Sequence, residues 1–141
     1  GMAIAMKAAN PRLQVWGVQP TTTAVLAAWL EAGRPVPFPE GTSIADGLGA
    51  RIEEDSITFP LAQRYLDRVV IVSDREIQSA MLWLLEEHQM VAEPSGAAPV
   101  AALLQARPVG FQSVVAVLTG RNISRQRYLT LINEALVGGP D

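Results

Sequence analysis

Residues 68–85 read RVVIVSDREIQSAMLWLL and contain a strand that leads directly into a helix. The first five residues are mostly β-branched and apolar, which is typical of a strand covered on both faces. Ser73 and Glu76 then have the spacing of a capping box, in which the two side chains satisfy free backbone donors at a helix start. The apolar residues that follow recur every three or four positions, at Ile77, Ala80, Met81, Leu84 and Leu85. This stretch predicts one strand–helix unit of an α/β protein.

The rest of the chain continues this alternation of strands and helices. Short apolar runs predict further strands at residues 13–19 and 113–118. Composition and spacing predict helices at residues 2–9, 21–32, 60–67, from the end of AEPSG (92–96) to about residue 107, and 124–136. Such sequences form a three-layer α/β/α fold, in which helices cover both faces of a mainly parallel sheet. We expect one such domain over residues 1–141, with Gly1 a remnant of a purification tag.

The composition excludes several classes of function. The 141 residues carry 11 basic and 14 acidic side chains, a net charge of −3, so no basic surplus exists to bind nucleic acid or an anionic membrane. No apolar stretch is long enough to span a bilayer. The absence of cysteine excludes disulfides, thiolate metal sites and cysteine nucleophiles, and it fits the cytoplasm, where we place the protein. A single histidine, His88, cannot build a multi-histidine metal site, and its place near a helix end favours a solvated role.

Three loops are candidates for a binding site. They are SIADGLG at residues 43–49, AEPSGAA at residues 92–98 and LTGRN at residues 118–122. The first ends a long proline- and glycine-rich loop over residues 34–49, and the third follows the predicted strand 113–118. Ligands of open parallel sheets bind beyond the carboxyl ends of the strands, where such loops lie. Taken one at a time, each loop is also explained by ordinary turn chemistry.

Together with GVQP at residues 17–20 and VSDREI at residues 72–77, these loops resemble the carboxy-terminal portion of the threonine dehydratase and serine racemase family. The members of this family are pyridoxal-phosphate enzymes of fold type II. Five segments occur in the family's order between Met2 and Asn122. Together they make the resemblance more specific than any one segment would. It implies a partial fold type II large domain and an ancestry among threonine and serine ammonia-lyases of amino-acid metabolism.

The resemblance also assigns residues to a cofactor site. In the family, a hydroxyl or thiol after the last strand hydrogen-bonds the pyridine nitrogen, and Thr119 matches that position, with Gly120 beside it. A neutral hydroxyl there leaves the nitrogen unprotonated, which suits α,β-elimination. By the same resemblance, Gly47 would line the cofactor ring with its backbone, and Glu93 would lie beside the ring. Asp46 would hold its loop in shape.

Other parts of the family's site are absent from these 141 residues. The family binds its cofactor as a Schiff base with a lysine in a serine-x-lysine context, whereas the only lysine here, Lys7, lies in an alanine-rich helix. The glycine-rich phosphate loop is also absent. Arg121 replaces a glycine of the family, and the metal-binding positions of serine racemases carry Gln19 and Val25, which do not suit a divalent cation. We therefore expect no catalytic residue, no metal and no bound pyridoxal phosphate in this chain alone.

These departures favour a carboxy-terminal fragment of a threonine or serine dehydratase-like protein that is inactive by itself. Such a fragment would come from a reading frame that is truncated, split or mis-started. Two alternatives stay open. One is a module that binds a small ligand or another protein, and the other is one half of a split enzyme completed by a separate amino-terminal half. Removing half of a layered domain leaves sheet edges and apolar faces uncovered. We therefore expect a homo-oligomer, in the form of a two-fold dimer.

Overall fold

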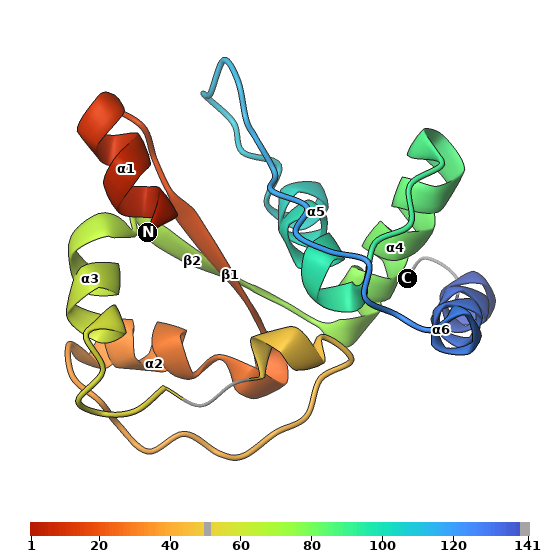
Figure 1. The fold of residues 1–141 in the computed structure, drawn as a ribbon, viewed down its shortest axis with the longest axis horizontal. Helices are drawn as coiled ribbons and strands as arrows, with labels where there is room; N and C mark the ends of the chain where they lie inside the picture. The colour runs from red at the N-terminus through yellow and green to blue at the C-terminus, as the bar shows by residue number, and fades with distance from the viewer. Residues whose placement is uncertain (50–51, 139–141) are drawn as a thin grey trace.

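Two parallel strands stand at the centre of the computed structural model, which describes residues 1–49 and 52–138 (Figure 1). In chain order the elements are α1 (Met2–Ala9), β1 (Trp16–Pro20), α2 (Val25–Ala32), α3 (Thr58–Tyr65), β2 (Arg68–Val72), α4 (Asp74–His88), α5 (Pro94–Ala106) and α6 (Arg125–Gly138). Two short 3₁₀ turns lie at Thr21–Thr23 and Asp46–Leu48. None of the described helices has the length and apolar character needed to cross a membrane.

The strands β1 and β2 pair in parallel, with Trp16 opposite Arg68 and Pro20 opposite Val72. A parallel pair cannot be joined by a tight turn, and the connection here contains α2, α3 and the loop between them. Figure 1 shows α1, α2 and α3 on one side of the strand pair and α4, α5 and α6 on the other. This is the three-layer α/β/α order that the sequence predicts, built on a small parallel sheet.

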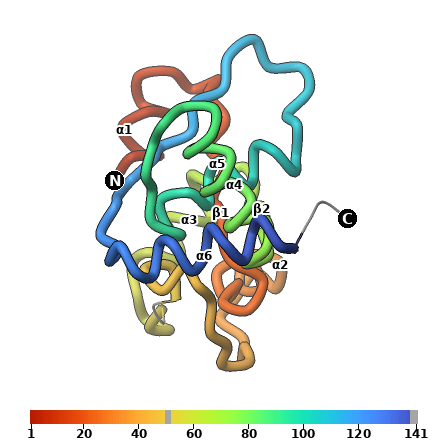
Figure 2. The backbone as a smooth tube through the Cα atoms, turned by 90° about the vertical axis from the view of Figure 1, so that its right-hand side faces the viewer, coloured from red at the N-terminus to blue at the C-terminus, as the bar shows by residue number. Residues whose placement is uncertain are grey.

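The hydrophobic core lies between the strands and the helices α4, α5 and α6. The predicted core positions of α4 are confirmed, since four are buried and one packs against the cluster: Ile77, Ala80, Met81, Leu84 and, partly buried, Leu85. Helix α6 lies outside α4 (Figure 2) and contributes three buried side chains: Tyr128, Leu131 and Ile132. The carboxy-terminal helices therefore share one core with β2.

The start of α4 is fixed by the predicted capping box. The Ser73 hydroxyl accepts a hydrogen bond from the Glu76 backbone N–H at 3.2 Å, and the Ser73 N–H donates to the Glu76 carboxylate at 2.6 Å. The N–H groups of a first helical turn otherwise have no partner within the helix. The strand β2 therefore passes into α4 at one defined residue, beyond the carboxyl end of the strand.

The chain turns from β1 into α2 around the side chain of Gln19. Its amide oxygen accepts from the Ala27 N–H at 2.9 Å, and its amide nitrogen donates to the Thr23 carbonyl at 3.2 Å. In an unbroken helix these two backbone groups would bond to each other. The predicted helix over residues 21–32 is therefore wrong in its first turn, and α2 begins only at Val25.

The loop over residues 34–49 is ordered, as its composition predicts. Near its start, the Trp29 indole N–H donates to the Val36 carbonyl at 2.8 Å. Near its end, the Ser43 hydroxyl donates to the Asp74 carboxylate in the first turn of α4. The second contact holds the end of this loop beside the carboxyl end of β2.

The predicted strand at residues 113–118 is not formed. Within the described residues, β1 pairs only with β2, and the segment makes no backbone ladder with either strand. A strand needs a neighbour for its backbone donors and acceptors, and an apolar run does not supply one by itself. The segment therefore remains irregular and largely exposed, with Val115 at 79% exposure.

Candidate cofactor-binding site

The three candidate loops meet at the first turn of α5. The backbone N–H of Glu93, which precedes the helix, donates to the Gly120 carbonyl at 3.0 Å. This bond joins the chain before α5 to the loop at residues 118–122. The loop at residues 43–49 reaches the same turn, where Gly47 lies against the Ser95 side chain. The structure therefore brings Gly47, Glu93 and Gly120 together.

Three glycines allow this close packing. A Cβ atom at Gly96 would lie 2.7 Å from the Gly120 carbonyl oxygen, and one at Gly47 would lie 2.9 Å from Ser95 Oγ. At Gly120 itself, a Cβ atom would collide with the Glu93 carboxylate. Glycine permits such an approach because it has no side chain. The loops consequently touch one another directly.

The Ser95 hydroxyl is the most unusual polar group of this site. It is shielded from solvent and has no hydrogen-bond partner among the described residues. An unpaired buried hydroxyl costs about 1–3 kcal/mol. The sequence does not single out Ser95, because an unpaired hydroxyl is a property of the packed chain. The adjacent glycine of the PSG segment is the one available signal.

The remaining predicted site residues differ in their surroundings. Thr119 is exposed next to Gly120, and Arg121 is exposed as well. Asp46 holds its own loop in shape, as predicted, because its carboxylate accepts a hydrogen bond from the Gly47 N–H at 2.8 Å. No group of three or more histidine, cysteine, aspartate or glutamate residues in the described part of the chain is arranged to hold a metal ion.

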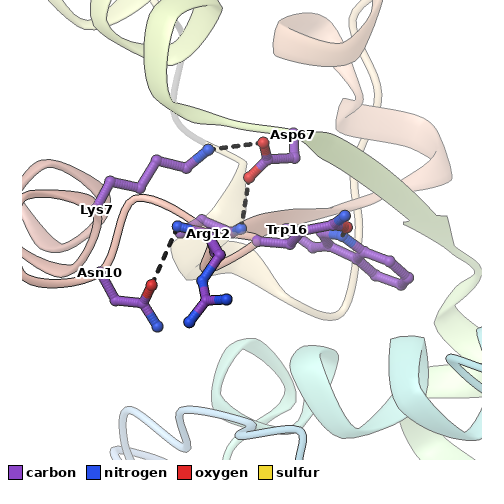
Figure 3. Close-up of polar contacts among 7 residues, drawn as sticks. Lys7, Asn10, Arg12, Trp16 and Asp67 are labelled. Carbon is purple, nitrogen blue, oxygen red and sulfur yellow. Dashed lines mark hydrogen bonds and ion pairs between the residues drawn. The ribbon is translucent and has the colours of Figure 1, made fainter. Parts of the chain in front are cut away.

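The only lysine of the chain, Lys7, is engaged at the opposite end of the strands (Figure 3). Its ammonium group forms a 2.6 Å ion pair with Asp67, which immediately precedes β2. The three loops, in contrast, meet beyond the carboxyl ends of the strands. The strands β1 and β2 have five residues each, and a strand of five residues spans roughly 13 Å. The Lys7 ammonium group is therefore held well away from the candidate site.

The Asp67 carboxylate connects α1 to both strands. Besides Lys7, it binds the Val15 N–H at 2.7 Å, while the Asp67 N–H donates to the Val15 carbonyl at 2.9 Å. The hydrogen bond from Lys7, followed by the one from Val15, lowers the pKa of Asp67 below its ordinary value of 3.8. Sequence reasoning misses this role of Lys7 because its partner lies 60 positions away.

These features define a parallel α/β domain with glycine-rich loops gathered beyond its strands, an arrangement in which ligands bind at the carboxyl ends of the strands. Residues 1–120 match the family described as pyridoxal-phosphate dependent enzyme. The chain belongs to this family, and the resemblance predicted from the loops is confirmed.

Individual relatives agree with the family. The chain is 36% identical to the L-threonine ammonia-lyase of Thermotoga maritima over 137 residues, which cover 97% of this chain and 34% of that protein. Among solved structures, the threonine deaminase from T.th. has a TM-score of 0.78 at 31% identity, over 87% of this chain and 45% of that one. Maize serine racemase has a TM-score of 0.80 at 27% identity, over 94% and 42%. The chain thus spans less than half the length of these relatives.

Proposed function

We propose that residues 1–141 form one domain, the carboxy-terminal portion of a threonine dehydratase-like enzyme, a pyridoxal-phosphate-dependent ammonia-lyase for threonine or serine. The meeting of Gly47, Glu93 and Gly120 at the first turn of α5 carries this proposal. The similarity of nearly the whole chain to a protein named L-threonine ammonia-lyase supports the substrate class.

The residues present fit the ring of pyridoxal phosphate but not its covalent attachment. Thr119 would hold the pyridine nitrogen through its hydroxyl, and Gly47 would line the ring with its backbone. The unpaired Ser95 hydroxyl adds a polar group in the same place. When bound, pyridoxal phosphate supplies an electron sink for the bonds around the α-carbon of the substrate. The attachment lysine has no counterpart here, since Lys7 is paired with Asp67.

Residues 1–141 alone are therefore proposed to be inactive. The chemistry requires a lysine and a phosphate-binding loop from a part of the enzyme that these residues do not span. The coverage of the Thermotoga maritima relative, 34% of its length, leaves ample chain for both. The lysine then comes from a preceding segment or from a separate polypeptide.

A titration with pyridoxal phosphate, followed by visible absorbance, tests the inactivity of the chain. The Lys7→Arg variant retains the charge that pairs with Asp67 but cannot bind the cofactor covalently. Lys7→Ala removes both the charge and the amine that could form a Schiff base. We expect no absorbance band that depends on Lys7 and no ammonia release from threonine. A band present in the wild type and lost in both variants would overturn this part of the proposal.

Reconstitution tests the lyase function itself. The chain is co-expressed with an amino-terminal fragment of the Thermotoga maritima L-threonine ammonia-lyase that carries the lysine and the phosphate loop. Ammonia release from threonine by the complex, and by neither part alone, is the expected result. The matched control replaces the fragment's lysine by alanine. A complex that forms, retains pyridoxal phosphate and leaves threonine and serine untouched contradicts the lyase assignment.

Self-association remains a further proposal. Helix α6 has exposed apolar side chains on its outer surface, at Leu129, Leu136 and Val137. Exposed apolar groups of this kind favour association of copies. We expect a dimer by light scattering, and a monomer at all accessible concentrations would contradict it.

A further inference from the structure

Asp74, the first residue of α4, holds the end of the loop at residues 43–49. One oxygen of its carboxylate accepts a hydrogen bond from the Ser43 hydroxyl, and the other accepts from the Ile44 N–H at 3.1 Å. Hydrogen bonds to an ionised carboxylate are about twice as strong as those between neutral groups. The two bonds join residues that lie 31 and 30 positions apart, so the loop is attached to a distant helix.

The loop extends this attachment to Gly47. The Ser43 hydroxyl also accepts from the Ala45 N–H at 3.1 Å, and the Ala45 side chain is fully buried in the core. The Leu48 N–H then donates to the Ala45 carbonyl at 2.9 Å, which closes the 3₁₀ turn at Asp46–Leu48. A displacement of Ser43 would therefore move Ala45 and, with it, the turn that contains Gly47.

Asp74 is itself held in place by its helix. The capping box at Ser73 defines the first turn of α4, and Ile77, three residues after Asp74, is fully buried. Helix α4 packs against α5, and the first turn of α5 carries Ser95, against which Gly47 lies. The 3₁₀ turn lies beside the carboxyl ends of the strands (Figure 1). The contacts thus form a closed path from α4 through the loop to α5.

We propose that Asp74 is the positioning residue of the candidate cofactor site, because it holds Ser43 and Ile44 and thereby fixes the place of Gly47 beside the first turn of α5. The inference rests on the proposed function, in which Gly47 lines the ring of pyridoxal phosphate. Asp74 acts through the loop and not by contact with the cofactor. A loop that is already held in its binding position loses less conformational freedom when a ligand binds. Loss of the Asp74 carboxylate should therefore weaken cofactor binding.

Hydrogen exchange of the chain alone tests whether Asp74 holds the loop. In Asp74→Ala, the amides of Ile44, Ala45 and Leu48 should exchange at least about tenfold faster than in the wild type, because two bonds to a charged group are lost. The matched control is Asp67→Ala, since Asp67 precedes β2 at its other end and likewise accepts one side-chain donor and one backbone N–H. The control should leave exchange in the loop unchanged. Equal rates in Asp74→Ala and the wild type would overturn the proposal.

Variants of Ser43 separate this role from a general effect on α4. Ser43→Ala removes the donor without changing α4, so it should speed the exchange of the same amides, whereas Ser43→Thr retains a hydroxyl and should restore slow exchange. Combining Ser43→Ala with Asp74→Ala should speed exchange by less than the product of the two single effects, because the two side chains act through one contact. Effects that multiply in full would assign Asp74 to the helix alone and contradict the proposal.

The reconstituted complex relates the loop to the cofactor. In the complex with the amino-terminal fragment described above, Asp74→Ala should lower the retention of pyridoxal phosphate after gel filtration about fivefold or more. Ser43→Ala should lower it as well, and Ser43→Thr and Asp67→Ala should not. Equal retention by Asp74→Ala and the wild type would show that the loop can be released without effect on the cofactor, which rejects the positioning role.

The positioning role and the lyase function fail in different ways. A complex that retains pyridoxal phosphate less well in Asp74→Ala, but releases no ammonia from threonine or serine, supports the positioning role and contradicts the lyase function. Ammonia release by a complex whose retention does not depend on Asp74 contradicts only the positioning role. If no complex forms, the lyase proposal fails, and hydrogen exchange in the chain alone decides whether Asp74 fixes the place of Gly47.

Discussion

The Lys7 ammonium group and the Asp67 carboxylate form a 2.6 Å ion pair that joins segments 60 positions apart. Because Asp67 also binds the Val15 N–H, this pair attaches α1 to the start of both strands. Removing Asp67 loses the ion pair and also the carboxylate that accepts from the Val15 N–H, whereas removing Lys7 loses the ion pair alone. The two partners are therefore not equivalent for stability.

We predict that Asp67→Ala lowers the free energy of unfolding by about 1–2 kcal/mol, since it unpairs a backbone donor as well as a charge. Lys7→Met should cost less than about 1 kcal/mol, because partly exposed ion pairs contribute little. Urea denaturation followed by circular dichroism measures both losses. The control is Glu87→Gln, an exposed carboxylate of α4, with an expected change within about 0.5 kcal/mol. A larger loss for Lys7→Met than for Asp67→Ala would contradict the geometry.

The same carboxylate predicts a dependence of stability on pH. The pKa of Asp67 is lowered in the folded chain, so the unfolded chain binds a proton more readily and stability rises with pH. The contribution is complete above the ordinary pKa of 3.8 and is lost as the pH falls through the lower folded value. The difference in unfolding free energy between the wild type and Asp67→Asn should therefore shrink below about pH 4. A difference that grows under acid would refute the assignment.

The contact between Gly96 and Gly120 predicts a sharp response to one methyl group. Gly96→Ala places a Cβ atom 2.7 Å from the Gly120 carbonyl oxygen, and backbone on both sides must move. Overpacking of this kind costs about 1–3 kcal/mol. Gly17→Ala is the matched control, because its Cβ atom would make only ordinary contacts, with the side chains of Leu66 at 3.4 Å and Val69 at 3.6 Å and with the Arg68 carbonyl oxygen at 4.0 Å. Thermal unfolding compares the two, and equal melting temperatures would show that the loops do not touch.

The capping box predicts that Ser73→Ala destabilises α4 by about 1 kcal/mol. The hydroxyl accepts the Glu76 N–H, and alanine leaves that donor unpaired. Ser73→Thr should restore most of the stability, since threonine also caps helices and keeps the hydroxyl that donates to the Glu76 carboxylate at 2.8 Å. Ser79→Ala, on the exposed surface of the same helix, should be neutral or slightly stabilising. Chemical denaturation of the four proteins separates capping from simple loss of a serine.

Local signals in the sequence are sufficient for much of this fold. The junction of β2 and α4 is predicted to the residue, because the capping box is contained within four consecutive positions. The strand at residues 113–118 is mispredicted, because strand formation depends on a neighbour that the chain does not provide. The start of α2 is mispredicted for a related reason, since the Gln19 side chain separates two backbone groups that helical periodicity would pair.

The residues of the candidate site divide in the same way, into those indicated by local sequence and those whose state depends on the folded chain. Gly47, Glu93 and Gly120 are proposed from the sequence because each lies in a segment that resembles a known family, and the structure brings the three together while their part in cofactor binding stays a prediction. Ser95 and the pairing of Lys7 are not found, because both depend on contacts across the folded chain. Local motifs thus indicate which loops lie together, whereas the state of individual side chains depends on contacts that form only in the folded chain.

Replacing Ser95 by alanine should affect the stability of the chain and its binding of a ligand in different ways. Replacing a buried hydroxyl that has no partner among the described residues by alanine removes an unsatisfied group, so Ser95→Ala should leave the free energy of unfolding unchanged or raise it by up to about 1 kcal/mol. Ser73→Ala, which changes the same residue type at another helix start, should do the opposite.

If the hydroxyl belongs to the cofactor site, Ser95→Ala should also weaken the retention of pyridoxal phosphate by the reconstituted complex several-fold, measured by absorbance after gel filtration. A loss of stability in the chain alone would show that the hydroxyl already has a structural partner, and unchanged retention in the complex would exclude Ser95 from the cofactor site.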